Sequence, residues 1–292
     1  MRATAPTFDY YSPRTVTEAL NLIGKLKPVN IIAGGTDFVP AVRLKGFRPK
    51  HVVSLVNLRK ELSYVTFKGG TVRIGALTRI RDAQRSEHLR KKATCLHEAL
   101  SQIGSVQIRN MATIGGNLCD ASPAADSAPP LLVLDASVQI VRKGGRRTIP
   151  LKDFFLGPGK TVLRKGELLK EITFRPDADT ASSFQKLGRT RGKDISIATA
   201  AVLLKTDGSR ISQARIALGS VAPIPIRAYK SEKELVGKVT SEAVLDSAAA
   251  KAAEEAKPIT DVRTTGDYRR SAVKALVRQG LARALERARG DA

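Results

Sequence analysis

Two glycine-rich segments organise this sequence: Ile31-Ile32-Ala33-Gly34-Gly35-Thr36-Asp37 and Ala112-Thr113-Ile114-Gly115-Gly116-Asn117. Each follows an apolar or β-branched run and joins glycines to small hydroxyl or amide side chains. Glycine lets the backbone approach a ligand closely and turn its N–H groups toward an anion. The first segment stands between an expected buried strand and an expected helix, whose positive end adds to this attraction. Either segment alone also fits a tight turn with a capping residue.

The composition is that of a globular protein with an ordinary core. The chain has 292 residues, 42% of them hydrophobic and 26% charged, which suffices for two domains or one large one. The N-terminus, Met1 to Pro6, lacks the apolar segment of a secretory signal. The longest apolar run, Ile195 to Leu204, is too short to cross a membrane. We therefore expect a cytoplasmic protein without a membrane span.

The cysteines and histidines argue against a metal site. Cys95 and Cys119 are too few for a disulfide framework or a four-cysteine iron–sulfur cluster. The three histidines, His51, His88 and His97, lack the spacing of metal ligands. If this chain takes part in redox chemistry, an organic cofactor has to carry the electrons.

The net charge of +23 is large but unspecific. Basic residues are spread along the sequence, and only 4% of the residues are aromatic, so stacking platforms for single-stranded nucleic acid are scarce. We expect no nucleic-acid partner and interpret the charge as solvated surface or complementarity to a protein partner.

Apolar periodicity predicts the organisation of the chain. A first lobe, residues 1–57, is expected to be of β-α-β type, with helices over 15–26 and 38–44 and strands over 29–33 and 51–55. A second lobe, residues 58–176, is expected to hold two hairpins, helices over 93–103 and 123–134, and a strand over 167–174. A polar, turn-forming stretch over 175–179 marks the boundary to an α+β domain over 180–290.

Several standard motifs are absent. Gly157-Pro158-Gly159-Lys160-Thr161 resembles the end of a phosphate-binding loop, but Phe154 stands where the first glycine of that loop belongs. No G-x-G-x-x-G follows a strand and no G-x-S-x-G occurs, so neither a nicotinamide-binding Rossmann unit nor a serine hydrolase is indicated. The two glycine-rich segments remain as the candidate site.

Both segments resemble the paired FAD motifs of the medium, FAD-binding subunit of molybdenum hydroxylases, the group of xanthine dehydrogenase, aldehyde oxidase and carbon monoxide dehydrogenase. The resemblance extends over nearly the whole chain through ordered blocks at 121–126, 184–189, 222–228 and 261–270. It implies an α+β fold: a two-lobed FAD-binding domain of the vanillyl-alcohol-oxidase (PCMH) type, followed by a small α+β domain of the carbon monoxide dehydrogenase flavoprotein type.

The resemblance also implies which residues bind FAD, and it assigns no catalytic acid, base or nucleophile to this chain. The implied cofactor-binding residues are Ile32, Ala33, Gly34, Gly35, Thr36, Asp37, Phe38, Ile103, Gly104, Thr113, Gly116, Asn117, Asp120, Asp126, Leu169 and Lys186. Relatives with covalently bound flavin carry a histidine in a glycine-rich turn, whereas Thr36 follows the glycines here, so the FAD is expected to be non-covalent. The two cysteines are also too few for the benzoyl-CoA reductase branch, which carries an extra iron–sulfur cluster.

As a member of this family, the chain would transfer electrons rather than bind the substrate. Electrons would leave a molybdenum cofactor in a large subunit, cross two [2Fe–2S] clusters of a small subunit, and reach NAD⁺ or another acceptor through the FAD held here. A dimer of heterotrimers is the expected assembly. The alternative is a stand-alone FAD-dependent oxidoreductase that acts directly on a small substrate.

Overall fold

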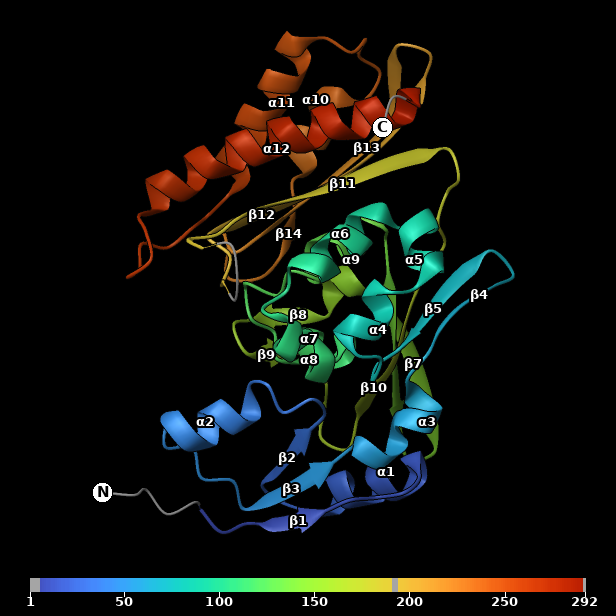
Figure 1. Ribbon diagram of the computed structural model, residues 1–292, viewed down its shortest axis with the longest axis vertical. Helices are drawn as coiled ribbons and strands as arrows, with labels where there is room; N and C mark the ends of the chain where they lie inside the picture. The colour runs from blue at the N-terminus through green and yellow to red at the C-terminus, as the bar shows by residue number, and fades with distance from the viewer. Residues whose placement is uncertain (1–5, 191–193, 291–292) are drawn as a thin grey trace.

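The structure, a computed structural model, describes residues 6–190 and 194–290 and has three tiers (Figure 1). Residues 1–5 of the expected first lobe lie outside the described residues. The N-terminal elements form one end of the molecule, the middle of the chain forms the centre, and the C-terminal sheet and helices form the other end. The expected α+β class is confirmed.

The first lobe is a small parallel sheet with two helices. Its strands are β1 (Asp9–Tyr11), β2 (Val29–Ile32) and β3 (His51–Ser54), in the order β1-β3-β2. Helix α1 (Val16–Lys25) starts at Thr15, whose hydroxyl accepts a hydrogen bond from the Glu18 amide at 3.1 Å. Helix α2 (Phe38–Leu44) has the bounds that the sequence predicts, and it follows β2 after five residues of loop. A 3₁₀ turn (Val56–Leu58) and α3 (Arg59–Leu62) lead onward.

The second lobe is built on an antiparallel sheet of order β4-β5-β10-β6-β7. These strands are β4 (Val65–Lys68), β5 (Thr71–Gly75), β6 (Ser137–Arg142), β7 (Gly145–Pro150) and β10 (Leu168–Phe174). Short helices cover one face: α4 (Ile80–Gln84), α5 (Glu87–Lys92), α6 (Thr94–Gln102), α7 (Val106–Met111), α8 (Ile114–Cys119) and α9 (Ala128–Val133). A 3₁₀ turn (Leu151–Asp153) and the hairpin β8 (Phe155–Gly157) and β9 (Lys160–Thr161) complete the lobe. The helix expected over 123–134 corresponds to α9, which is shorter and begins only at Ala128.

The core under the first lobe is shared by both lobes. Leu20, Ile23 and Val53 come from the first lobe, and they pack in one buried cluster with Leu77 and Leu168 of the second. The first lobe therefore completes its core only against its neighbour.

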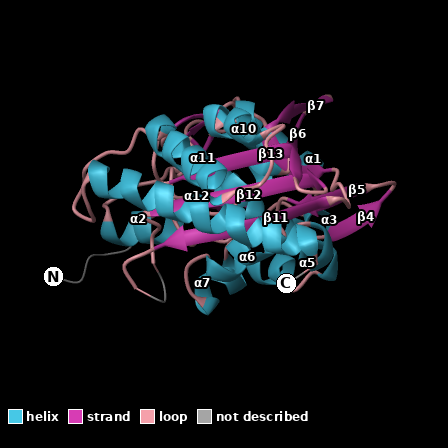
Figure 2. Ribbon diagram, turned by 90° about the horizontal axis from the view of Figure 1, so that it is seen from above, coloured by secondary structure: helices cyan, strands magenta, loops and turns pink. Residues whose placement is uncertain are grey.

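The C-terminal part is a four-stranded antiparallel sheet, and Figure 2 shows helices α11 and α12 lying over its strands. Its strands are β11 (Thr180–Leu187), β12 (Ala198–Asp207), β13 (Arg210–Gly219) and β14 (Ile226–Arg227). The outer layer consists of α10 (Tyr229–Leu235), α11 (Glu242–Glu255) and α12 (Gly266–Arg289). Helices α6 and α9 of the second lobe pack on the inner face.

Burial on both faces explains why β12 is an unbroken apolar run. Val202 and Leu204 belong to the cluster with the α12 residues, whereas Ala201 and Leu203 belong to the cluster with α6 and α9. Successive side chains of a strand point to opposite faces, so a strand covered on both sides needs apolar residues at every position.

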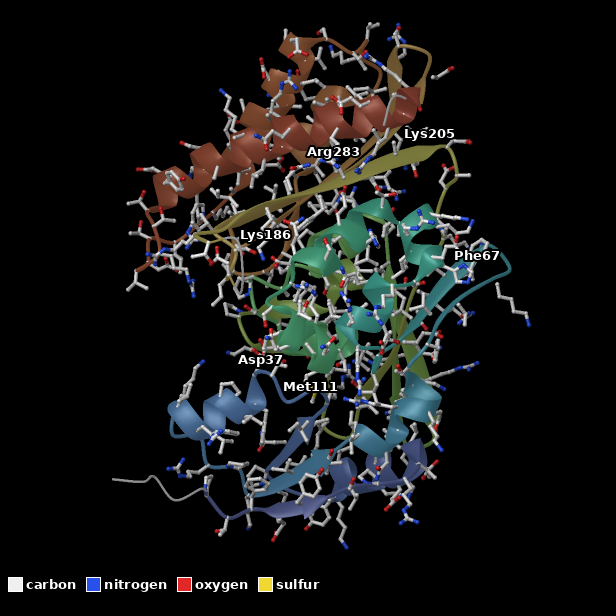
Figure 3. All side chains as sticks on the ribbon, in the orientation of Figure 1. Asp37, Phe67, Met111, Lys186, Lys205 and Arg283 are labelled. Atoms are coloured by element: carbon white, nitrogen blue, oxygen red, sulfur yellow. The ribbon has the colours of Figure 1, made fainter. Side chains whose placement is uncertain are left out.

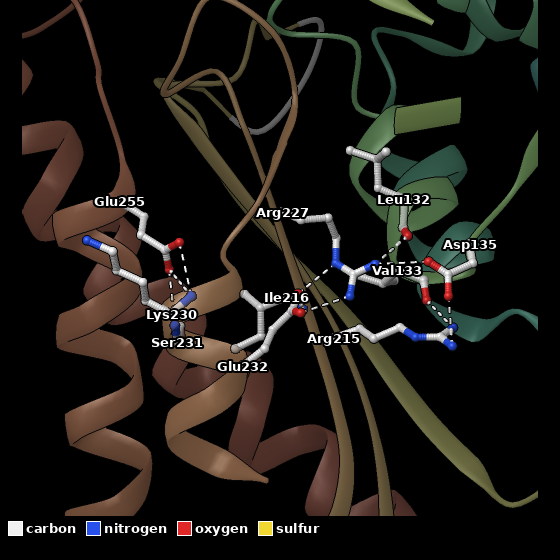
Figure 4. A network of polar contacts seen from close by, with 10 residues as sticks. All are labelled: Leu132, Val133, Asp135, Arg215, Ile216, Arg227, Lys230, Ser231, Glu232 and Glu255. Atoms are coloured by element: carbon white, nitrogen blue, oxygen red, sulfur yellow. Dashed lines mark hydrogen bonds and ion pairs between the residues drawn. The ribbon is translucent and has the colours of Figure 1, made fainter. Parts of the chain in front are cut away.

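A polar network joins the C-terminal sheet to the end of α9 (Figure 4). Asp135 accepts from Arg215 at 2.7 Å and from Arg227 at 2.9 Å, and Arg227 also pairs with Glu232 at 2.6 Å. Both arginines reach backbone carbonyl groups at the end of α9, those of Leu132 and Val133. The C-terminal sheet is thereby tied to the second lobe by charge-assisted hydrogen bonds as well as by apolar packing.

Within residues 6–190 and 194–290, the helices are all too short or too polar to cross a membrane.

Candidate functional site

A cavity of about 680 Å³ lies where the two lobes meet. It falls within the range of about 300–1,000 Å³ that is typical of cofactor sites. Of the residues expected to bind a cofactor, all but Lys186 line it: Ile32, Ala33, Gly34, Gly35, Thr36, Asp37, Phe38, Ile103, Gly104, Thr113, Gly116, Asn117, Asp120, Asp126 and Leu169. The fold thus brings together segments that are far apart in the sequence.

The loop between β2 and α2 offers open hydrogen-bond donors to this cavity. The amides of Gly35, Thr36, Asp37 and Phe38 donate no hydrogen bond within the described part of the chain. The loop carbonyls are partly used, because Gly35 accepts from the Val39 amide at 3.0 Å. Successive N–H groups of this kind form a concave binding site for an anion.

The second glycine-rich segment is a helix start and not the turn that the sequence predicts. Thr113 caps α8, and its hydroxyl accepts from the Gly116 amide at 3.0 Å. The amides of Ile114 and Gly115 donate to Thr78 and Ala76 at 3.0 and 2.9 Å. Its backbone donors are therefore used inside the protein, and this segment forms a wall of the cavity rather than an anion site.

Glycine is required at Gly34 because the two segments touch there. A Cβ at Gly34 would overlap the carbonyl oxygen of Met111 and would lie 2.8 Å from the Cα of Ala112. Asp37 and Met111 lie at the junction of the two lobes (Figure 3). Direct contact between the backbones of the first loop and the residues before α8 sets the width of the cavity at this point.

Polar side chains on the cavity wall are held by partners behind it. The Asn117 side-chain oxygen accepts from the Ser127 hydroxyl at 2.6 Å. Asp126 accepts from the Ser196 hydroxyl at 2.5 Å and pairs with the Lys186 ammonium group at 2.8 Å. Burial raises the pKa of Asp126, and its interactions with Lys186 and Ser196 oppose that rise. Lys186 itself stands behind Asp126 and does not line the cavity.

Two carboxylates, those of Asp37 and Asp120, line the cavity near α2. Burial raises the pKa of Asp120, the negative charge of Asp37 raises it further, and Lys45 lowers it. Both aspartates line the cavity. Carboxylates accept hydrogen bonds from hydroxyl groups, so this end suits the hydroxyl-bearing part of a ligand better than its phosphates.

Several lining residues were not predicted, among them Lys45, Leu163, Glu167 and Asp194. Glu167 is held by a two-pronged interaction with Arg147, at 3.0 and 2.7 Å, and its side chain is 4% exposed. These hydrogen bonds from Arg147 hold the pKa of Glu167 below its usual range. The pair joins positions far apart in the sequence, so no local pattern indicates it.

Among the described residues, no cluster of histidine, cysteine or carboxylate side chains could hold a metal ion. The two thiols do not resemble redox groups either. Burial raises the pKa of Cys95 and of Cys119 to about 12.

Comparison with known proteins assigns the chain that holds this site to a family. Residues 6–175 match the model of the FAD binding domain in molybdopterin dehydrogenase, and residues 182–284 match that of the carbon monoxide dehydrogenase flavoprotein C-terminal domain. The chain belongs to the FAD-binding subunits of the molybdenum hydroxylases.

Relatives of this FAD-binding subunit match over nearly their full lengths. The glyceraldehyde dehydrogenase medium chain of Sulfolobus acidocaldarius is 33% identical and aligns with 93% of this chain and 96% of the relative. Carbon monoxide dehydrogenase of Hydrogenophaga pseudoflava, whose structure lacks the Mo-pyranopterin moiety, has a TM-score of 0.94 at 32% identity, with 98% and 99% of the two chains covered. Quinoline 2-oxidoreductase of Pseudomonas putida 86 has a TM-score of 0.92 at 28% identity, with 99% of each chain covered.

The residues of this FAD-binding subunit fit the cofactor that its family implies. The β2–α2 loop presents open amide donors for a pyrophosphate, and Asp37 and Asp120 offer acceptors at one end of the cavity. The cavity also has apolar lining from Ile103, Leu168 and Leu169, which suits a flat ring system. The resemblance stated from the sequence is confirmed at the level of family, fold and oxidoreductase class.

Proposed function

We propose that this chain is the FAD-carrying electron-transfer subunit of a molybdenum hydroxylase complex. The observation that carries the proposal is the cavity between the lobes, which has open amides on the β2–α2 loop and is lined by the residues expected for FAD. In this proposal the chain passes electrons from [2Fe–2S] clusters of a small partner subunit to NAD⁺ or another acceptor. The substrate is oxidised at a molybdenum cofactor in a large partner subunit.

The residues of this chain bind and orient the cofactor. The amides of Gly35, Thr36 and Asp37 would hold the pyrophosphate, and the carboxylates of Asp37 and Asp120 would accept from sugar hydroxyl groups. Bound FAD supplies the ability to accept electrons singly and to release them as a pair. Thr36 carries a hydroxyl group in place of a histidine, which supports non-covalent binding.

The wider assembly follows from the same proposal. We expect FAD-binding and C-terminal domains over 1–176 and 180–290, and a dimer of heterotrimers in the cytoplasm, where free Cys95 and Cys119 stay reduced. The net charge of +23 favours docking to acidic surfaces of the partner subunits, and we expect no nucleic-acid partner.

Co-purification of the native complex tests this function. The expected result is a yellow complex of three different subunits that contains molybdenum and iron and releases its FAD on denaturation. In anaerobic titration, substrate should reduce the FAD only when all three subunits are present. A flavoprotein that oxidises a small substrate on its own would refute the proposal and support the stand-alone oxidoreductase.

The acceptor is tested on the same complex after anaerobic reduction. NAD⁺, quinones and dyes are added separately, and the rate of flavin reoxidation is followed by absorbance. Fast reoxidation by one physiological acceptor identifies it, whereas fast reoxidation by none of them would contradict a role in delivering electrons to a soluble acceptor.

A further inference from the structure

Lys186 is a buried cation of the C-terminal sheet that contacts the cavity wall from behind. It lies on β11 near the junction of that sheet with the second lobe (Figure 3). Its side chain is 7% exposed, and its ammonium group donates to the Asp126 carboxylate at 2.8 Å. It also donates to the backbone carbonyls of Gln102 at 2.9 Å and Asp194 at 3.3 Å.

These three acceptors belong to separate segments of the chain, each of which contributes to the cavity wall. Gln102 ends α6 and directly precedes Ile103 and Gly104, which line the cavity. Asp126 and Asp194 line it themselves. One ammonium group therefore connects all three segments, whereas the hydrogen bond from Ser196 to Asp126 joins only two of them.

The hydrogen-bonding capacity of Lys186 is used up by these contacts. A lysine ammonium group has three N–H donors, and each has an acceptor in the protein. Burying such a charge is unfavourable unless it is paired and hydrogen-bonded, so the arrangement is costly to disturb. No donor is left to reach a cofactor, which distinguishes Lys186 from the residues that line the cavity.

A second link between the same elements lies one turn earlier in α6. Glu98 accepts from the Phe184 amide of β11 at 2.8 Å and pairs with Arg287 of α12. Arg283, one turn earlier on α12, lies 3.7 Å from the same carboxylate. Helix α6 is thus held by the C-terminal domain both in its middle and at the end that leads into the cavity.

We propose that Lys186 is a positioning residue through which the C-terminal domain holds the α6 end, Asp126 and Asp194 at the spacing that FAD binding requires. The inference rests on the proposed function, because it takes FAD as the ligand of this cavity. It makes the C-terminal sheet a part of the cofactor site although Lys186 does not touch the cofactor.

The test measures FAD binding by the full-length apo-protein through quenching of flavin fluorescence. Lys186→Met keeps most of the side-chain volume and removes the charge, and we expect it to weaken FAD binding about tenfold. Lys205→Met is the matched control, because Lys205 lies on the neighbouring strand β12 and pairs with Asp177 and Asp179 far from the cavity. The control should bind FAD like the parent protein.

A pH series separates positioning from direct contact. The charged groups acting on Asp126 are Lys186 of β11 and Asp194 of the following loop. Without Lys186, Asp126 keeps only Ser196 and the repulsion from Asp194, so its pKa rises further and it takes up a proton as the pH falls. The FAD affinity of Lys186→Met, measured relative to that of the parent protein at each pH, should therefore recover as the pH falls from about 8 to about 5.

The single variant Lys186→Met leaves the buried Asp126 carboxylate without its charged partner, which can destabilise the fold. The double variant Lys186→Met with Asp126→Asn removes both charges of the pair and avoids this defect. It should bind FAD more tightly than Lys186→Met and more weakly than the parent protein. Parent-like binding by Lys186→Met or by the double variant would overturn the inference. A double variant as weak as the single one at every pH would also overturn it, because Lys186 would then contact FAD itself. Failure of the parent protein to bind FAD would instead refute the proposed function.

Discussion

The contact at Gly34 gives the sharpest prediction about the site. Gly34→Ala adds one methyl group where the first loop meets Met111 and Ala112. The new Cβ would lie 2.8 Å from the Cα of Ala112, whereas ordinary contacts lie at 3.4–4 Å, so the two segments have to separate by at least about 0.6 Å. The obstacle is backbone on both sides and cannot rotate away.

The magnitude follows from overpacking a contact of this kind. Inserting a methyl group into a closely packed position costs about 1–3 kcal/mol. The same shift moves the open amides of the β2–α2 loop away from the wall that faces them. We therefore expect Gly34→Ala to lose about 1–3 kcal/mol of unfolding free energy and to bind FAD at least about tenfold more weakly.

Gly24→Ala is the control, because a Cβ at Gly24 meets nothing within 4 Å and this glycine lies inside helix α1. Alanine favours a helix, so this variant should gain about 0.5–1 kcal/mol and bind FAD normally. Urea denaturation gives the stabilities and fluorescence quenching gives the affinities. A Gly34→Ala protein with the stability and FAD affinity of its parent would refute the role assigned to this contact.

Three further predictions concern residues around the cavity. Glu167→Gln should lose about 1–3 kcal/mol at neutral pH, because it weakens the charged pair with Arg147. The pKa of Glu167 is lower in the folded protein than in the unfolded chain, so Glu167 stabilises the fold above its unfolded-state pKa and loses this effect as the pH falls through its folded-state pKa. Between about pH 7 and about pH 3, the urea midpoint should therefore fall less in Glu167→Gln than in the parent protein. Thr113→Val should cost about 1 kcal/mol through loss of the α8 cap, whereas Thr113→Ser should restore most of it, and equal urea midpoints for the two variants would contradict the cap. Cys95, which is fully buried, should resist iodoacetamide at about pH 8 until the protein unfolds, as measured by mass spectrometry, and its rapid labelling in the native protein would contradict its raised pKa.

The sequence was most informative where structure is decided locally. The helix predicted over 38–44 is α2 (Phe38–Leu44), and the strand before it ends within one residue of its predicted end. Apolar spacing and the intervening glycine loop carry that information without help from the rest of the chain. Family resemblance added the residues that line the cavity, which periodicity could not select.

Features decided by distant contacts were not predicted. Gly115 and Gly116 are poor helix formers, yet they belong to α8, because Gly115 packs on Ala76 and Thr113 caps the helix. The Lys186–Asp126 pair joins residues that only the folded chain brings together. Whether a given residue touches FAD or supports its neighbours depends on such pairings, so sequence motifs alone do not separate the two roles.

The core shared between the lobes bears on how a ligand enters the cavity. Parting the lobes like a hinge would uncover Leu20, Ile23 and Val53 together with Leu77 and Leu168, all of which are buried against one another. Each such side chain contributes about 1.5–3 kcal/mol when buried, so this opening is strongly opposed. FAD should therefore enter and leave through the mouth of a preformed cavity, and its exchange rate should depend on the residues of that mouth rather than on separation of the lobes.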